Sequence, residues 1–184
     1  MKEKIINHAL RMLKKDGLKS FSMRKLAESL SIDPMAIYYY FKNKDHLIAE
    51  LVEVVFRKFY HGLRLEAGNG DQKEKLETVL IVYRSFFIQN IDLSLYLIQS
   101  PNHEQHAVQM LNELILDLIV SSNPKENAEL TRDILIDFIH GNALSVSNLV
   151  RKRPSGKTNQ FLTDQFKETL KLLFNHLFDN TRLS

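Results

Sequence analysis

Residues 22–47 read SMRKLAESLSIDPMAIYYYFKNKDHL, and this stretch decides the fold. Its apolar pattern predicts two short helices joined by a tight turn, followed by the start of a third helix. Ser22 is a good N-cap for the first helix, because its hydroxyl can accept a backbone N–H from the first turn. Asp33 can cap the second helix in the same way, and Pro34 at the first helical position loses no N–H that the helix needs.

Three consecutive tyrosines, Tyr38, Tyr39 and Tyr40, follow in the second short helix. Ile37 and Phe41 are four residues apart and can point into the same core. Successive helical residues are about 100° apart, so the three rings cannot all be buried with that pair, and at least one or two should face outward. Exposed phenol rings beside cations suit a polyanion, because hydroxyls and lysines contact phosphate oxygens while helix side chains enter a major groove. The neighbouring cations are Arg24, Lys25, Lys42 and Lys44.

The run RKLAESLSIDPMAIYYYFKNKDHL, residues 24–47, resembles the helix-turn-helix of the tetracycline-repressor (TetR) family of transcription regulators. The resemblance covers about the first third of the chain, and it is carried by Arg24-Lys25-Leu26-Ala27, by Ile37-Tyr38-Tyr39-Tyr40-Phe41, and by Lys44 and Leu47. Ser31 stands where the family usually has glycine, so a residue with a Cβ must adopt the left-handed conformation of the turn. Met23 replaces the small hydroxyl residue that commonly touches phosphate in the family.

The resemblance implies a role in DNA recognition for each matching residue. Arg24 would contact a base edge, most naturally guanine, and Met35 or Ala36 would touch a thymine methyl group. The residues expected in or beside the major groove are Pro34, Met35, Ala36 and Tyr40. The residues expected at the phosphates are Tyr38, Tyr39 and Lys44. Ser22 would be a cap first and a phosphate contact second, whereas Asp33 would only cap, because a carboxylate near phosphates costs energy.

Composition excludes several classes of protein. A chain of 184 residues with 44% hydrophobic residues can form one domain, or a small domain continuous with a larger one. The absence of cysteine excludes disulfides and thiolate zinc sites and fits the reducing cytoplasm, where we expect the protein to act. Charges flank both sides of a broken apolar stripe at the N-terminus, so no signal peptide is expected. No apolar run approaches the length of a membrane span, and we expect no membrane partner.

The charge of the chain is unevenly distributed. The net charge is +3, but residues 1–61 hold 12 Lys and Arg against 7 Asp and Glu, a net charge of +5. Residues 62–184 hold 13 against 15, a net charge of −2. A basic first part beside a mildly acidic second part favours contact between the first part and a polyanion.

Helical periodicity continues along the chain, and no stretch after residue 71 alternates as a strand does. We therefore expect an all-α fold of about nine helices, with an N-terminal three-helix helix-turn-helix DNA-binding domain at 1–47 and a C-terminal helical ligand-binding and dimerisation domain at 48–184. A bridging helix at about 44–61 has an apolar stripe too long for the small domain to cover. Besides the two short helices, the expected helices are 2–16, 44–61, 72–90, 92–99, 103–121, 124–150 and 160–178, with a turn at Gly68–Asp71 and a polar loop at Arg151–Gln160.

The last two expected helices carry apolar residues on more than one face. One face can pack inward and another against a second copy, which would give a homodimer through a four-helix interface. The alternative is a pair of deeply buried helices in a monomer; the family's mode of dimerisation favours the homodimer. A two-fold dimer would also let two small DNA-binding domains read two half-sites about 34–36 Å apart.

The middle helices should enclose a small-molecule pocket, as in the family. They combine apolar bulk with a few polar groups, which is the usual composition of a ligand site. Ordinary core packing is the alternative for each residue, and for His140 a structural pair with Asp137. The candidate lining residues are Tyr83, Phe86, Phe87, Tyr96, Met110, Phe138, His140 and Asn142.

Enzyme signatures are absent from the sequence. No nucleophile–base pair, metal cluster or cofactor loop has a recognisable spacing, so we expect neither catalysis nor a cofactor. His103 and His106 can share a helix face, but the spacing of zinc proteases is missing, and we expect no metal site. The glycines at 68 and 70 lack the Lys-Ser/Thr of a phosphate-binding loop. The basic residues of 151–157 are interpreted as a solvated loop.

These features and the resemblance together predict a homodimeric, ligand-responsive transcription regulator, most naturally a repressor of palindromic operator DNA. A small-molecule effector that prefers a dimer with wrongly spaced DNA-binding domains would shift the population away from operator DNA. The alternative is a non-specific DNA-binding or helical interaction protein without effector control. Salt dependence on specific and random DNA separates the two.

Overall fold

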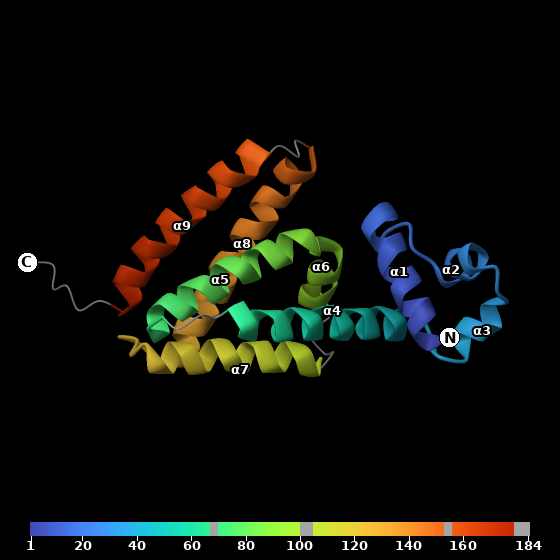
Figure 1. Ribbon diagram of the computed structural model, residues 1–184, viewed down its shortest axis with the longest axis horizontal. Coiled ribbons are helices and arrows are strands. Elements are labelled where there is room, and N and C mark those ends of the chain that lie inside the picture. Colours follow the sequence, from blue (N-terminus) through green and yellow to red (C-terminus); the bar gives the residue numbers. More distant parts are fainter. Residues whose placement is uncertain (67–69, 100–104, 153–155, 179–184) are drawn as a thin grey trace, which may run out of the picture. The chain divides into compact units, whose positions relative to one another are not determined.

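The computed structural model describes residues 1–66, 70–99, 105–152 and 156–178. Within these ranges the chain forms nine helices and no strand (Figure 1). None of the described helices combines the length and the apolarity needed to cross a membrane. The helices are α1 (Lys2–Asp16), α2 (Met23–Leu30), α3 (Pro34–Tyr38), α4 (Lys44–Glu66), α5 (Gln72–Gln89), α6 (Ile91–Gln99), α7 (His106–Ser121), α8 (Ala128–Lys152) and α9 (Gly156–Phe178). The expectation of an all-α fold is confirmed.

The helices divide into two compact units. Unit 1 comprises Met1–Tyr60 and Asn90–Gln109, and unit 2 comprises His61–Gln89 and Met110–Ser184. Helices α4 and α7 therefore contribute residues to both units. The domain boundary expected after residue 47 is a different division of the chain, and it stays a prediction.

The core of unit 1 is built from one face of α1, from the short helices and from the first half of α4. Helix α1 is amphipathic as predicted, and it ends at Gly17, whose φ of 75° lets its N–H bond to the Leu13 carbonyl. That glycine lies in the left-handed region, which a side chain disfavours. The buried residues of unit 1 include Ile5, Ala9, Leu13, Phe21, Leu26, Ile37, Phe41, Leu47, Ile48, Leu51, Val52 and Phe56.

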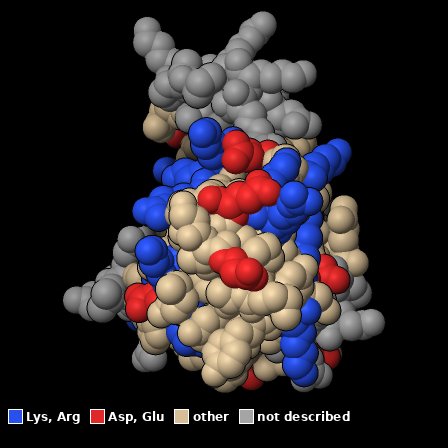
Figure 2. Space-filling model, turned by 90° about the vertical axis from the view of Figure 1, so that its right-hand side faces the viewer, with Lys and Arg blue, Asp and Glu red and all other residues tan. Residues whose placement is uncertain are grey.

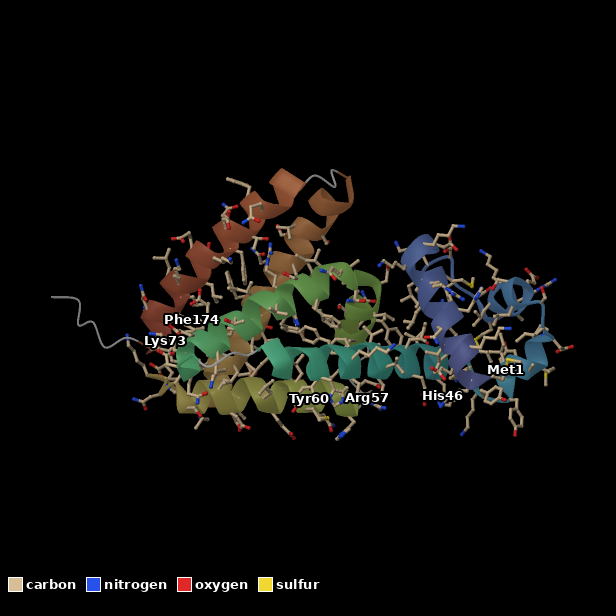
Figure 3. The ribbon with its side chains drawn as sticks, viewed as in Figure 1. Met1, His46, Arg57, Tyr60, Lys73 and Phe174 are labelled. Atoms are coloured by element: carbon tan, nitrogen blue, oxygen red, sulfur yellow. The ribbon has the colours of Figure 1, made fainter. Side chains whose placement is uncertain are left out.

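The core of unit 2 is formed by α5, α8 and α9 with the second part of α7. Its ends are held by aromatic contacts, seen where α5 begins and α9 ends (Figure 3): Nζ of Lys73 lies 5.9 Å from the ring centre of Phe178, which packs 5.1 Å from Phe174. The buried residues of unit 2 include Leu76, Leu80, Phe87, Leu111, Ile115, Ile119, Leu135, Ile139, Ala143, Phe166, Leu170 and Phe174.

The structure differs from the expected helix bounds at several ends. Helix α4 runs to Glu66 rather than to about residue 61. Helix α8 begins at Ala128 rather than near Pro124, because Oδ1 of Asn127 accepts the N–H groups of Glu129 and Leu130 at 2.8 and 3.2 Å. The asparagine is the stronger start signal, since it satisfies two N–H groups at once.

The expected loop at 151–160 is wrong for most of its length. Helix α8 continues to Lys152 and α9 begins at Gly156, so only residues 153–155 lie between them, outside the described residues. A polar composition suggested a loop, but polarity alone does not distinguish a loop from the end of a helix. The expected turn at Gly68 and Asn69 and the histidine at position 103 also lie outside the described residues.

Candidate functional site

The turn between α2 and α3 is built by side-chain caps and one left-handed residue. The Ser22 hydroxyl accepts the N–H of Lys25 at 3.2 Å, which starts α2 as predicted. Ser31 ends the helix with φ 55° and ψ 43°, so the serine does adopt the conformation that glycine favours. The N–H of Ile32 then bonds to the Ala27 carbonyl at 3.1 Å and closes the turn.

Helix α3 is short, and its orientation is set by two buried side chains. Oδ1 of Asp33 accepts the N–H of Met35 at 2.7 Å, and Pro34 occupies the first helical position, as predicted. Ile37 and Phe41 are both fully buried. The helix itself ends at Tyr38, and residues 39–40 continue as a turn. A five-residue helix contributes little stability of its own, so the buried pair must hold it in place.

The opposite face of α3 carries exposed side chains. Met35 is 71% exposed, Tyr38 43% and Tyr39 82%, whereas Tyr40 is half-buried with its ring centre 4.9 Å from that of Tyr39. The expectation that one or two of the rings face outward is confirmed. Pro34 is exposed and Ala36 half-buried. Of the expected groove residues, Pro34 and Met35 are thus the more accessible, and Ala36 and Tyr40 the less accessible.

Arg24 lies on α2 and is accessible. Its Nε lies 3.1 Å from Oε1 of Glu28, and its side chain is 85% exposed. Such an exposed ion pair contributes at most about 1 kcal/mol. The guanidinium can therefore leave Glu28 for another acceptor at little cost.

Lys44 has a structural role that sequence reasoning missed. Its ammonium donates to the carbonyl oxygens of Phe21 at 2.9 Å and of Leu18 at 3.3 Å, and it lies 5.8 Å from the centre of the Phe21 ring. These bonds tie the start of α4 to the connection between α1 and α2. The contact of Lys44 with a phosphate stays a prediction, and the carbonyl contacts use donors that such a contact would need.

Charge on the side that carries α2 and α3 follows a simple pattern. Figure 2 shows Lys and Arg side chains on both flanks of a broad, largely uncharged area. Some Asp and Glu side chains lie beside these cations and some lie within the uncharged area. A surface of uncharged side chains bordered by cations can place apolar and phenolic groups at base edges while the border contacts phosphates.

Comparison with known proteins finds a similarity in the first part of the chain. Residues 5–51 match the family model "Bacterial regulatory proteins, tetR family". A curated relative, an uncharacterized HTH-type transcriptional regulator from Haemophilus influenzae, is 39% identical over 57 residues, which make up 31% of this chain and 30% of the relative. The chain therefore spans less than a third of the length of that relative.

Solved structures share the fold over nearly the whole chain. BioQ from Mycobacterium smegmatis superposes with a TM-score of 0.76 at 18% identity, covering 96% of both chains. FadR from Bacillus subtilis in complex with stearoyl-CoA has a TM-score of 0.64 at 19% identity, covering 94% of this chain and 97% of that one. BioQ with its double-stranded DNA operator has a TM-score of 0.64 at 16% identity, covering 91% and 98%. These identities establish the fold alone.

The expected pocket residues divide between the two units. Tyr96 belongs to unit 1, where its hydroxyl bonds to the Asp45 carbonyl at 3.4 Å. The others belong to unit 2, where Met110 and Phe86 are half-buried. Tyr83 and His140 are brought together, with the hydroxyl 2.8 Å from Nε2, and the Phe87 ring centre lies 4.6 Å from the imidazole.

Asn142 joins the same place through a residue that sequence reasoning missed. Its Oδ1 accepts Nε–H of Arg84 at 2.6 Å, and the Arg84 guanidinium lies 4.6 Å from the centre of the Phe166 ring. We call Tyr83, Arg84, His140 and Asn142 the buried polar cluster of unit 2. A sequence signal existed, because Arg84 continues the four-residue spacing of Leu76 and Leu80 and so places a cation on an apolar helix face.

Burial shapes the ionisation of the buried polar cluster. It raises the pKa of the Tyr83 hydroxyl and lowers the pKa of the Arg84 guanidinium. It also lowers the pKa of His140, an effect that the charge of Asp137 opposes. Burial penalises the charged form of each group. At neutral pH Tyr83 is therefore a neutral hydroxyl, and in the tautomer with Nε2 unprotonated the neutral imidazole accepts a hydrogen bond from its O–H.

Glu53 provides a second contact that sequence reasoning missed, this time within unit 1. Its Oε2 accepts the N–H of Ala107 at the start of α7 at 2.9 Å, and its Oε1 lies 2.6 Å from Nη2 of Arg57, one turn further along α4 (Figure 3). Burial raises the pKa of the Glu53 carboxyl, but the Ala107 and Arg57 bonds outweigh it and hold the pKa below its usual value. A carboxylate on α4 thus caps α7.

Metal ligands do not gather in the described part of the chain. No group of three or more His, Cys, Asp or Glu side chains there is arranged to hold a metal ion. His106 begins α7, whereas His103 and Glu104 lie outside the described residues.

Proposed function

We propose that the protein is a transcription regulator that binds palindromic operator DNA as a homodimer and represses transcription until a small-molecule effector releases it. The observation that carries the proposal is the division of α3 and the turn after it into a buried pair, Ile37 and Phe41, and exposed side chains, Met35, Tyr38 and Tyr39. The match of residues 5–51 to the TetR family model supports it, as does the structural neighbour that was solved with its operator.

The proposed roles of the DNA-binding residues follow their exposure. Arg24 reads a base edge, since its exposed guanidinium can exchange Glu28 for a guanine. Met35 and Ala36 contact apolar base edges in the groove, with Pro34 and Tyr40 beside them. The residues that contact phosphates are Tyr38, Tyr39, Lys44 and, through its hydroxyl, Ser22.

The proposed homodimer forms through α8 and α9. Both helices carry apolar side chains outside the core of unit 2, with Leu172 70% and Phe161 66% exposed and Leu130 and Ile134 also exposed. Apolar side chains in that number favour burial against a second copy. Leu172→Glu should therefore lower the mass measured by light scattering to that of a monomer. Val120→Glu, at an exposed apolar position on α7, is the matched control and should leave the mass unchanged.

The proposed effector binds in unit 2 near the buried polar cluster, with the aromatic residues around it as the apolar wall. The solved neighbour in complex with stearoyl-CoA supports a ligand site in this fold. The response is a shift of population between two dimer states, one with α3 helices spaced to fit the operator and one with α3 helices spaced wrongly. An effector that binds the wrongly spaced dimer more tightly raises its population and so lowers the fraction of protein on DNA. The route is α4, which contributes residues to both units and bonds through Glu53 to α7.

DNA binding is tested by selecting oligonucleotides with the full-length protein and comparing the selected and random duplexes over a range of salt concentrations. A regulator should prefer the selected sequence by a factor of at least about 1,000. Equal affinity for both duplexes at every salt concentration would favour the alternative, a non-specific DNA-binding protein.

Two variants separate the proposed roles on that selected duplex. Arg24→Ala should relax preference at particular base pairs by about 1–3 kcal/mol, whereas Tyr39→Phe should weaken binding to all sequences alike. Lys171→Ala removes an exposed charge from α9 and is the control for net charge. Parallel effects of the Arg24 and Tyr39 variants on all sequences would contradict this division of roles.

A further inference from the structure

Arg84 is a buried cation without a carboxylate partner among the described residues. The residue is 3% exposed, and its side chain donates one hydrogen bond within the described part of the chain, to the neutral amide of Asn142. Its Nη2 is buried and has no hydrogen-bond partner. Buried charges in proteins are normally paired, because an uncompensated one costs more free energy than almost any other buried group.

The contacts that Arg84 does make compensate only part of that cost. The Phe166 ring faces the guanidinium at 4.6 Å, which is favourable for a cation. The Nε–H bond to Asn142 is short, at 2.6 Å. Neither contact supplies an acceptor for Nη2, so one strong donor remains open inside unit 2.

The surroundings of Arg84 combine hydrogen-bonding groups with apolar walls. Tyr83, His140 and Asn142 are neutral polar groups, and the nearest carboxylate that acts on the cluster, Asp137, is exposed to solvent. Phe138 stacks on Phe166 at 5.4 Å, and Phe87 packs on His140. His140, Asn142 and Phe138 are only half-buried, so solvent reaches the cluster from the side of α8.

We propose that Arg84 receives the carboxylate of an organic anion with an apolar body, and that this anion is the effector. The carboxylate would accept from Nη2 and supply the missing counter-charge, and the apolar body would lie against the half-buried Phe138 ring. The guanidinium fork matches a planar carboxylate better than any neutral group. The effector role of this ligand rests on the proposed function, whereas the binding site does not.

The test measures binding to the full-length protein by calorimetry in the absence of DNA. Two pairs of probes are used, 1-naphthoate with 1-naphthamide and decanoate with decanamide, because each amide keeps the shape of its acid and lacks the charge. At least one acid should bind about tenfold or more tightly than its amide. If neither acid binds better than its amide, the proposal is overturned, and this comparison needs no variant.

Variants then locate the binding. Arg84→Met should lower the affinity for the acid to that of the amide, and Arg84→Lys should retain part of the preference because it keeps the charge but loses the fork. Arg132→Met is the matched control, since it removes a partly buried arginine of α8 that already pairs with Asp133. If the Arg132 variant no longer preferred the acid over the amide while the Arg84 variant still did, the assignment of the carboxylate to Arg84 would be overturned.

The same proteins, titrated with operator DNA, separate this proposal from the proposed function. Binding of the acid through Arg84 with no change in DNA affinity would remove the effector role and leave the anion site standing. Release from DNA by the neutral amide alone, equal in the wild type and Arg84→Met, would leave ligand-responsive regulation standing and overturn the anion site.

Discussion

The hydroxyl of Tyr83 on α5 lies 2.8 Å from Nε2 of His140 on α8, and both side chains take part in the core of unit 2. A neutral imidazole with Nε2 unprotonated accepts the O–H, whereas a protonated ring can only donate its Nε2–H to the Tyr83 oxygen, so protonation reverses the direction of the bond. Burial favours the same neutral form by lowering the pKa of His140. Packing of α5 on α8 is therefore coupled to the protonation of one histidine.

Unit 2 should lose stability in mild acid. The pKa of His140 in the folded chain is below 6.5, its ordinary value, so below that pH the unfolded chain binds a proton that the folded chain does not. The contribution of His140 is fully present above pH 6.5 and is lost as the pH falls toward the folded pKa. Urea unfolding across this range should show the loss. His140→Gln, which cannot titrate, should show a smaller one, and an equal loss in both proteins would contradict the coupling.

Glu53→Ala should destabilise unit 1. The change leaves the Ala107 N–H at the start of α7 without its acceptor, which costs about 1–2 kcal/mol in the free energy of unfolding. Because the pKa of Glu53 is below 4.5, the difference between wild type and variant should be full above that pH and vanish as the pH falls through the folded pKa. Arg57→Ala removes only an exposed partner and should cost less than about 1 kcal/mol. Equal costs would mean that the helix cap is unimportant.

Lys44→Met should weaken the fold of unit 1 as well as any contact with DNA. The two carbonyl groups that Lys44 bonds would lose a charged donor, at a cost of about 1–3 kcal/mol. Lys42→Met, at an exposed position two residues earlier, should leave the free energy of unfolding within about 0.5 kcal/mol. Guanidinium unfolding of both variants measures this. A Lys44 variant as stable as the wild type would show that the carbonyl bonds contribute nothing net.

Ser31→Gly should stabilise the turn between α2 and α3. The left-handed conformation costs a residue with a Cβ roughly 1–2 kcal/mol. Glycine removes that cost but loses more backbone entropy on folding, so the free energy of unfolding should rise by about 0.5–1 kcal/mol. Asn123→Gly is the control, because Asn123 has a similar φ of 57° but asparagine tolerates that region better. Its gain should be smaller. A destabilised Ser31→Gly protein would indicate that the hydroxyl makes a favourable contribution of its own.

Local signals explain what could be predicted from the sequence. The starts of α2 and α3 depend on Ser22 and Asp33, each of which acts within a few residues of its own position, and the sequence predicts both caps. The exposure of tyrosines beside Ile37 and Phe41 followed from helical periodicity alone. The start of α8 was expected near residue 124, whereas Asn127 caps the helix and α8 begins at Ala128.

Partners distant in the sequence explain what was missed. The bonds of Lys44 to Leu18 and Phe21, of Glu53 to Ala107 and of Arg84 to Asn142 join residues far apart in the sequence, on different helices or on a helix and a connection. Helical periodicity predicts which face of a helix a residue lies on, but it does not predict which residue elsewhere in the chain that side chain contacts. Three charged side chains that would otherwise be taken for solvated surface thus turned out to hold backbone or to lie in a core.

Helix α3 owes its position to Ile37 and Phe41, both inside the core, while Met35 and Tyr39 are almost free of the rest of the chain. Stability and surface chemistry are thereby assigned to separate residues of one short segment. Substitutions of the outward side chains therefore cost little stability, so the preferred binding partner can change through few mutations. New specificity is then open to stepwise evolution, one solvent-facing residue at a time.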